Sequence, residues 1–417
     1  MRLIRAHGFV VLLLLVVIFA AFGVLMATPL FNPLDFTIIK DAHILSLNTM
    51  DMFRYLGTYF SQPVLQLFFL LEYSLFCADQ HGYIAVNLLL HALNALLLYM
   101  LINMLFARKP MAVLAALLFA FSVGSYGKIL MTVAQQESLL LAHLHLLVLY
   151  LLIRNDFRHE GRLSSPYFIL GLGIFLLSGL TKASTFSVLG CLLAYKFFFY
   201  KERGGRGVFS LDLLILIGVG IVFYVAQSIW GYKSPTVFEH PGSPLQFTWV
   251  SFKNIFRYLN LMIFPLQPSS LVERANPVVQ IVFDIRTYIR VFLTLAIISY
   301  SFFGIVFGSR AVRFFIAWTY ISVLPFTGAS APGEWLNLQH LYLTSLGFCV
   351  ILAAGTMGLS NLLKIRRWRR YIPYLVPVSY VVLTLWITFE INSQNRRAGQ
   401  QPHVMGWRAE VESLCKD

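Results

Sequence analysis

A series of long apolar segments separated by short polar loops constrains this chain more than any other feature. Of its 417 residues 58% are hydrophobic and 12% charged, about half the charge of a soluble domain. A membrane crossing takes about 20 apolar residues. The sequence therefore predicts an all-α, polytopic integral membrane protein with about eleven spans: 9–27, 84–106, 111–126, 133–153, 166–181, 184–200, 209–229, 288–308, 312–328, 341–361 and 371–390.

The positive charge of the chain has a topological explanation. A formal net charge of +14 would suggest a nucleic-acid partner in a soluble protein. Here more than half of the 32 Lys and Arg residues fall in one set of loops or beside it, as the positive-inside rule requires of the cytoplasmic side. The first apolar run is too long for a signal peptide. We therefore expect an uncleaved first span, a cytoplasmic N-terminus, an outer C-terminus and no nucleic-acid partner.

Three long segments fall on the outer side, where function is expected: 29–83, 230–287 and 391–417. Within them, Asp51–Phe60, Val64–Phe76 and Val250–Phe264 are amphipathic or apolar, and the first two are too short to cross. They are predicted to lie in the membrane interface. We expect one transmembrane domain over 1–390 and a polar tail, 391–417, too short to fold alone.

The four cysteines show no spacing typical of a metal site or a disulfide framework. We predict no metal and no cofactor. Cys77 and Cys415 would both lie outside, where an oxidising compartment permits a bridge, although two free thiols are the favoured alternative.

A polar face runs through one apolar segment, Gly82–Leu101, where Asn87, His91 and Asn94 share one side of a helix. A seam that packs helix against helix is the favoured interpretation, and a wall of a substrate cavity is the alternative. Together with the motifs described next, the segment resembles the membrane glycosyltransferases of the GT-C superfamily. The likeness is strongest to the branch of the protein O-mannosyltransferases and the tetratricopeptide-repeat transmembrane enzymes.

The acidic positions of that family are partly lost in this chain. Phe36–Asn48 resembles the first outer loop, where an acidic pair is usual, but Lys40 stands at the first place and only Asp41 remains. Asp35 is the reserve candidate. Leu114–Leu147 resembles the third and fourth spans, and in their connecting turn acidity survives only at Glu137, while Lys128 adds a cation.

Three further segments carry the cations of the resemblance. Leu177–Phe186 keeps the family's lysine as Lys182, which could equally be a snorkelling anchor. Phe256–Leu271 resembles an interfacial helix and contains Arg257. In Leu338–Gly347, His340 stands where the family has arginine, and Tyr342 is retained.

The resemblance implies transfer of a sugar from a polyprenyl-phosphate donor to a protein or glycan on the outer face. It implies catalytic roles for Asp41 and Glu137, and substrate contacts by Lys40, Asn87, His91, Lys128, Lys182, Arg257, His340 and Tyr342. The other expected partners are membrane lipids and a further chain that recognises the acceptor. A bacterial inner membrane is the expected setting. A catalytically silent scaffold and a lipid-linked-sugar flippase are the alternatives, because several acidic residues are missing.

Overall fold

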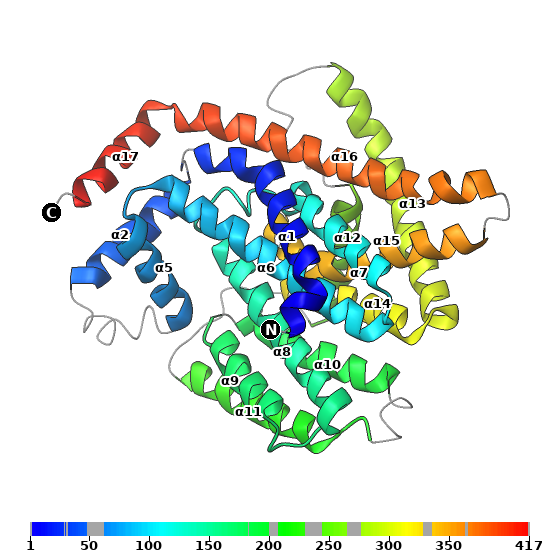
Figure 1. Ribbon diagram of the computed structural model, residues 1–417. Helices are drawn as coiled ribbons and strands as arrows, with labels where there is room; N and C mark the ends of the chain where they lie inside the picture. Colours follow the sequence, from blue (N-terminus) through cyan, green and yellow to red (C-terminus); the bar gives the residue numbers. More distant parts are fainter. Residues whose placement is uncertain are drawn as a thin grey trace.

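The computed structural model describes residues 2–28, 30, 32–47, 62–181, 183–199, 207–229, 244–264, 277–327, 336–362 and 366–415. Helices make up this part of the chain, as predicted (Figure 1). The α-helices are α1 Arg2–Phe22, α2 Pro33–Leu47, α5 Pro63–Phe76, α6 Gln80–Phe106, α7 Lys109–Phe121, α8 Gln136–His159, α9 Pro166–Gly179, α10 Ser187–Phe198, α11 Leu211–Ile229, α12 Pro244–Ile263, α13 Pro277–Phe307, α14 Arg310–Val323, α15 Leu341–Leu362, α16 Arg366–Gly399 and α17 Pro402–Leu414.

Six stretches of the described residues are long and apolar enough to cross a membrane. The other predicted spans are also helical, but four of them correspond to shorter apolar helices, so the predicted number of eleven is not established. Val64–Phe76 is the helix α5, whereas Asp51–Phe60 lies outside the described residues. The six candidate spans are His7–Ala27, Gln80–Phe106, Lys109–Tyr126, Gln136–His159, Leu338–Asn361 and Pro373–Gly399.

Local signals in the sequence set several helix ends. The Asp79 side chain accepts the backbone N–H of His81 at 3.0 Å and begins α6. The Ser165 hydroxyl accepts the N–H of Tyr167 and begins α9. Such caps satisfy N–H groups that have no partner inside the helix. A proline in the first turn of α5, α7, α9 and α17 needs no such partner.

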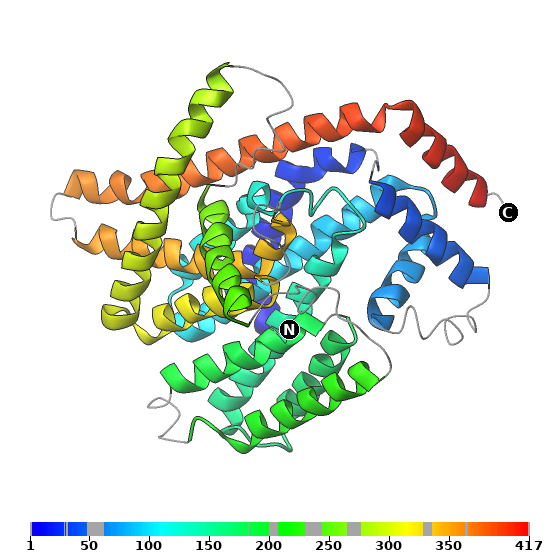
Figure 2. The ribbon, with the colours of Figure 1, turned by 180° about the vertical axis from the view of Figure 1, so that it is seen from behind.

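The hydrophobic core has a main part among the long helices and a second part at one end of the bundle. The second part joins α2, α5 and α17, with Ile39, Leu65, Tyr73, Val404 and Val411 all buried. Figures 1 and 2 both show α2 and α5 beside α17, close to the C-terminus. The polar tail thus packs on the first long loop instead of forming a unit of its own. We call these three helices the end assembly.

A disulfide closes the end assembly. Cys77 follows α5, Cys415 follows α17, and the two are bonded with their Cα atoms 6.0 Å apart. The sequence left this bridge open and favoured free thiols, because the scattered cysteines show no disulfide framework. The Lys40 ammonium also pairs with Glu410 of α17, but both side chains are exposed and such pairs contribute little.

We expect Cys415→Ser to loosen α17 from α2 and to destabilise the end assembly by about 2–4 kcal/mol. The measurement is the rate of protease cleavage within α17, with the wild-type chain under reducing conditions as the matched comparison. Equal gel mobility of the wild-type chain with and without reductant would contradict the bridge.

Candidate functional site

The connection between α7 and α8, residues 122–135, lies where several elements meet. A Cβ atom on Gly124 would lie 2.2 Å from the backbone oxygen of Thr384, so only glycine lets the connection approach α16 this closely. The hydroxyls of Ser125 and Tyr380 are hydrogen bonded at 2.9 Å. Gly127 has a φ of +67°, and an added Cβ would lie 3.4 Å from Leu338. The connection is therefore held between α16 and the short helix Leu338–His340.

Asp35 of α2 reaches this connection and is completely buried. Its Oδ1 accepts the backbone N–H of Ala134 at 2.8 Å. Its Oδ2 is also buried and bonds to no atom of the residues that the structure describes. Burial raises the pKa of Asp35 to about 7, because the backbone hydrogen bonds and the attraction of Lys128 only partly offset the loss of solvent. The carboxyl group can therefore exchange a proton near neutral pH.

Lys128 supplies the positive charge beside Asp35. Burial lowers the pKa of the Lys128 ammonium, while the attraction of Asp35 raises it. An acid that titrates near neutrality and a partly desolvated cation thus lie at one place. Such a pair suits proton transfer and the binding of an anion.

Two more carboxylates bound the same region. The side-chain amide of Gln136 donates to Glu72 at 2.9 Å, and burial raises the pKa of Glu72 to about 8. Glu137 accepts from the side chain of Gln62 at 3.1 Å. Glu72 was missed by sequence reasoning, although a lone acid within the apolar stretch Pro63–Phe76 is a usable signal.

The raised pKa values predict that Asp35 and Glu72 contribute less to stability as pH rises. Asp35 and Glu72 hold a proton in the folded state at pH values where the unfolded chain, with ordinary values of 3.8 and 4.5, has lost it. These two groups therefore bind more protons in the folded state, and the stability that they contribute falls from about pH 4 to pH 8. Unfolding temperatures in detergent at pH 5 and pH 8 measure this fall.

Single variants show how much of the pH dependence of stability comes from Asp35 and how much from Glu72. Asp35→Asn and Glu72→Gln should each remove about half of the pH dependence that these two groups contribute, because their shifts are similar. Asp41→Asn is the matched control, because it makes the same chemical change at a half-buried position of the same helix. A slope that neither buried variant alters would show that other groups cause it.

The α7–α8 connection also contacts α12 and the short helix Leu338–His340. Arg257 donates to the side chain of Asn254 at 2.8 Å, and Asn254 donates to the backbone oxygen of Thr327 at 2.8 Å. The ring of His340 stacks on Phe326, with centroids 4.1 Å apart, and its centroid lies 6.3 Å from that of Tyr258. Arg257 and His340 are thus held on neighbouring elements next to the segment that carries Lys128.

An apolar cavity of about 410 Å³ adjoins this group of residues. Leu259 and Met262 of α12 line it, about one turn of the helix after Arg257 and Tyr258. The remaining lining comes from α13, α14, α15 and α16, and it is mostly hydrocarbon. Such a lining suits the hydrocarbon part of an amphipathic lipid.

Three of the predicted substrate residues, Asn87, His91 and Tyr342, lie in the interior of the bundle instead. His91 is bonded through Nδ1 to the Tyr342 hydroxyl at 2.8 Å and through Nε2 to the backbone oxygen of Ala120 at 3.0 Å. Asn94 donates to the same hydroxyl at 3.1 Å, and Asn87 donates to the Thr132 backbone oxygen at 3.2 Å. All are completely buried. This arrangement matches the helix-packing interpretation of the polar face.

Three further residues were predicted to belong to the site: Lys40, Asp41 and Lys182. Lys40 is engaged with Glu410 of α17, and Asp41 is half-buried on the same helix. Lys182 lies outside the described residues. No group of three or more His, Cys, Asp or Glu side chains suited to a metal ion occurs within the described ranges.

A buried ionic cluster at the other end of the bundle was also missed. The Lys196 ammonium of α10 lies 2.6 Å from Asp212 of α11 and 3.4 Å from Asp156 of α8. Lys196 is completely buried. Sequence reasoning counted it only as one more cation near a span end, although a lysine inside the apolar stretch Ser187–Phe198 is the available signal.

Comparison with known proteins supports the fold. No protein-family model matches the sequence, and no curated protein matches it. Among solved structures, the chain is similar to the archaeal oligosaccharyltransferase AglB from Archaeoglobus fulgidus, solved in complex with an inhibitory peptide and a dolichol-phosphate. The TM-score is 0.52 and the identity 14%, over 93% of this chain and 56% of that chain. The chain therefore has a GT-C-like fold and spans little more than half the length of that neighbour, and the likeness does not single out the mannosyltransferase branch.

Proposed function

We propose that the protein is a membrane glycosyltransferase that moves a sugar from a polyprenyl-phosphate donor to a protein or glycan on the outer face. The observation that carries the proposal is the buried Asp35 beside Lys128, with one carboxylate oxygen that bonds to no described residue. The GT-C-like fold supports it, and so does the structural neighbour, which was solved with a peptide and a dolichol-phosphate.

The proposed reaction needs a base for the acceptor and a positive charge for the leaving group. Asp35 accepts the proton of the acceptor hydroxyl or amide as the acceptor attacks the anomeric carbon of the sugar. The bond from that carbon to the phosphate oxygen breaks, and the electron pair leaves with the phosphate. Lys128 and Arg257 stabilise the charge that develops on the phosphate, and His340 does so when protonated.

The apolar cavity along α12 is the proposed site for the lipid part of the donor. The apolar cavity along α12 would hold the first isoprene units, while the phosphate lies at its edge near Arg257. Asp35 takes the role that the sequence assigned to Asp41, because the buried carboxylate of Asp35 bonds to the α7–α8 connection. Glu137 stays a second candidate on the acceptor side, held by Gln62.

The disulfide supports a location of the proposed site on the outer side of the membrane. A disulfide between Cys77 and Cys415 requires an oxidising compartment, such as a periplasm or the outside of a cell. The end assembly and Asp35 lie at the same end of the long helices, where α1 ends and where α6 and α8 begin. We propose an inner-membrane enzyme with its N-terminus in the cytoplasm and a partner chain that presents the acceptor.

The test is transfer of radiolabelled sugar from crude polyprenyl-phosphate donors to envelope protein and glycan. Membranes with the wild-type chain should transfer label that membranes without the chain do not. Equal label in both would contradict the proposal in favour of a silent scaffold. Label that moves across the membrane with the chain but reaches no acceptor would instead indicate a flippase.

A further inference from the structure

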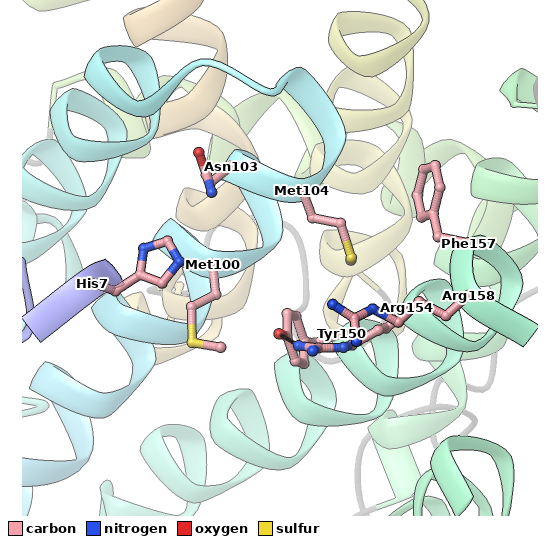
Figure 3. Close-up of a pocket in the computed structure, with 8 residues that line it drawn as sticks. All are labelled: His7, Met100, Asn103, Met104, Tyr150, Arg154, Phe157 and Arg158. Carbon is pink, nitrogen blue, oxygen red and sulfur yellow. Dashed lines mark hydrogen bonds between the residues drawn. The ribbon is translucent and has the colours of Figure 1, made fainter. Parts of the chain in front are cut away.

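A second pocket lies at the end of the bundle opposite Asp35. It has a volume of about 360 Å³ and lies where α1 begins and where α6 and α8 end (Figure 3). His7 of α1 faces Tyr150 and Arg154 of α8 across it, with Met100 and Met104 of α6 between them. Because the two ends of the same helices carry the two sites, this pocket cannot take part in chemistry at Asp35.

Arg154 is held in place by aromatic side chains. It donates to the Tyr150 hydroxyl, and its guanidinium carbon lies 5.5 Å from the centre of the Tyr150 ring and 5.2 Å from that of Tyr167. Its Nε is buried and bonds to no atom within the described parts of the chain. A guanidinium fixed in this way has already lost much of its side-chain freedom, so binding a ligand costs less entropy. Its Nε–H group can still donate a hydrogen bond.

The charge of the pocket is positive and is not neutralised from within. None of its eight lining residues is acidic, and Arg158 adds a second guanidinium. The nearby carboxylate of Asp156 is engaged with the buried Lys196 on another side of α8. His7 is hydrogen bonded through Nδ1 to Tyr99 at 2.8 Å, which fixes its ring at the opposite wall. The site therefore favours an anion.

The remaining lining shows which anion fits. Met100, Met104 and Phe157 give the pocket an apolar part, and the Phe157 side chain is 49% exposed. An inorganic ion would leave this surface without a partner, whereas a lipid headgroup brings its own hydrocarbon. Basic pockets between spans on the cytoplasmic side are suited to anionic lipids. The cation distribution in the sequence assigns this end to that side.

We propose that the pocket lined by His7, Arg154 and Arg158 binds the phosphate group of an anionic lipid headgroup. The fork of Arg154 contacts the phosphate oxygens, Arg158 adds charge at the rim, and the methionines contact the glycerol and the first acyl carbons. The bound lipid joins α1 to α6 and α8 at this end. The inference does not depend on sugar transfer.

The test uses the full chain in phosphatidylcholine vesicles that contain phosphatidylglycerol as the minor lipid. Native mass spectrometry counts the phosphatidylglycerol molecules that the protein retains. Arg154→Gln should reduce retention about tenfold, since it removes charge-assisted hydrogen bonds. Arg158→Gln changes an exposed side chain, cannot disturb the core, and should also weaken retention.

Arg162→Gln is the matched control, because it removes an equal charge from an exposed position just after α8. Retention should stay at the wild-type level. Equal losses in Arg154→Gln and Arg162→Gln would overturn the proposal, since diffuse attraction would then explain binding. Inorganic phosphate that displaces phosphatidylglycerol at equal concentration would overturn the lipid as the source of the phosphate. An intact Cys77–Cys415 bridge shows that each variant is folded.

Discussion

Asp35→Asn should lower the rate of sugar transfer by about 10²–10⁴-fold, the usual contribution of a general base. The substitution keeps the shape of the side chain and the hydrogen bond from Ala134, but it removes the group that accepts the proton. Wild-type transfer should also rise with pH through about 7, where Asp35 loses its proton. Initial rates with a fixed donor concentration, measured from pH 5.5 to pH 8.5, give both results.

Asp41→Asn is the matched control for this prediction, because it makes the same change on the same helix. Transfer by this variant should stay within about threefold of wild type, since a half-buried residue away from the reacting atoms contributes little. The reverse result, with Asp41→Asn inactive and Asp35→Asn active, would return the catalytic role to the residue that the sequence alone favoured.

Lys196→Met should lower the free energy of unfolding by about 3–5 kcal/mol, the cost of breaking a buried ionic cluster on one side. The ammonium contacts Asp212 at 2.6 Å and Asp156 at 3.4 Å, and its loss removes the cation that both buried carboxylates share. The methionine fills a similar volume, so a cavity contributes little. Unfolding in detergent, followed by helical circular dichroism, measures the change.

The triple variant Lys196→Met, Asp156→Asn and Asp212→Asn separates charge from packing. It should regain most of the lost stability, because no charge is then buried without a partner. Sugar transfer by this variant should match wild type, since the cluster lies at the opposite end of the bundle from Asp35. A triple variant as unstable as Lys196→Met would show that the lysine acts through its packing instead.

The helices could be predicted from the sequence because hydropathy and polar breaks are local properties of the chain. Val64–Phe76 is apolar and begins after a proline, and it forms α5. The face shared by Asn87 and His91 follows from helical spacing alone, and it packs against α7, the α7–α8 connection and α15. Such features need no knowledge of the rest of the fold.

The candidate site could be predicted only in part, because burial of its acids depends on contacts distant in sequence. Asp35 and Asp41 lie on one helix, and no local signal shows which of them meets Ala134, 99 positions away. Family position favoured Asp41, whereas packing of α2 on the α7–α8 connection favours Asp35. The Cys77–Cys415 bridge could not be predicted either, because it depends on the packing of α17 against α2 and α5.

Donor consumption by the purified chain tests the central claim most directly. The protein, reconstituted with a polyprenyl-phosphate-linked sugar and an envelope extract as the source of acceptor, is followed by mass spectrometry of the lipid. We expect the wild-type chain to convert the donor to free polyprenyl phosphate and Asp35→Asn to leave the donor intact. A donor that stays intact with folded wild-type chain and the full range of donor sugars would contradict it.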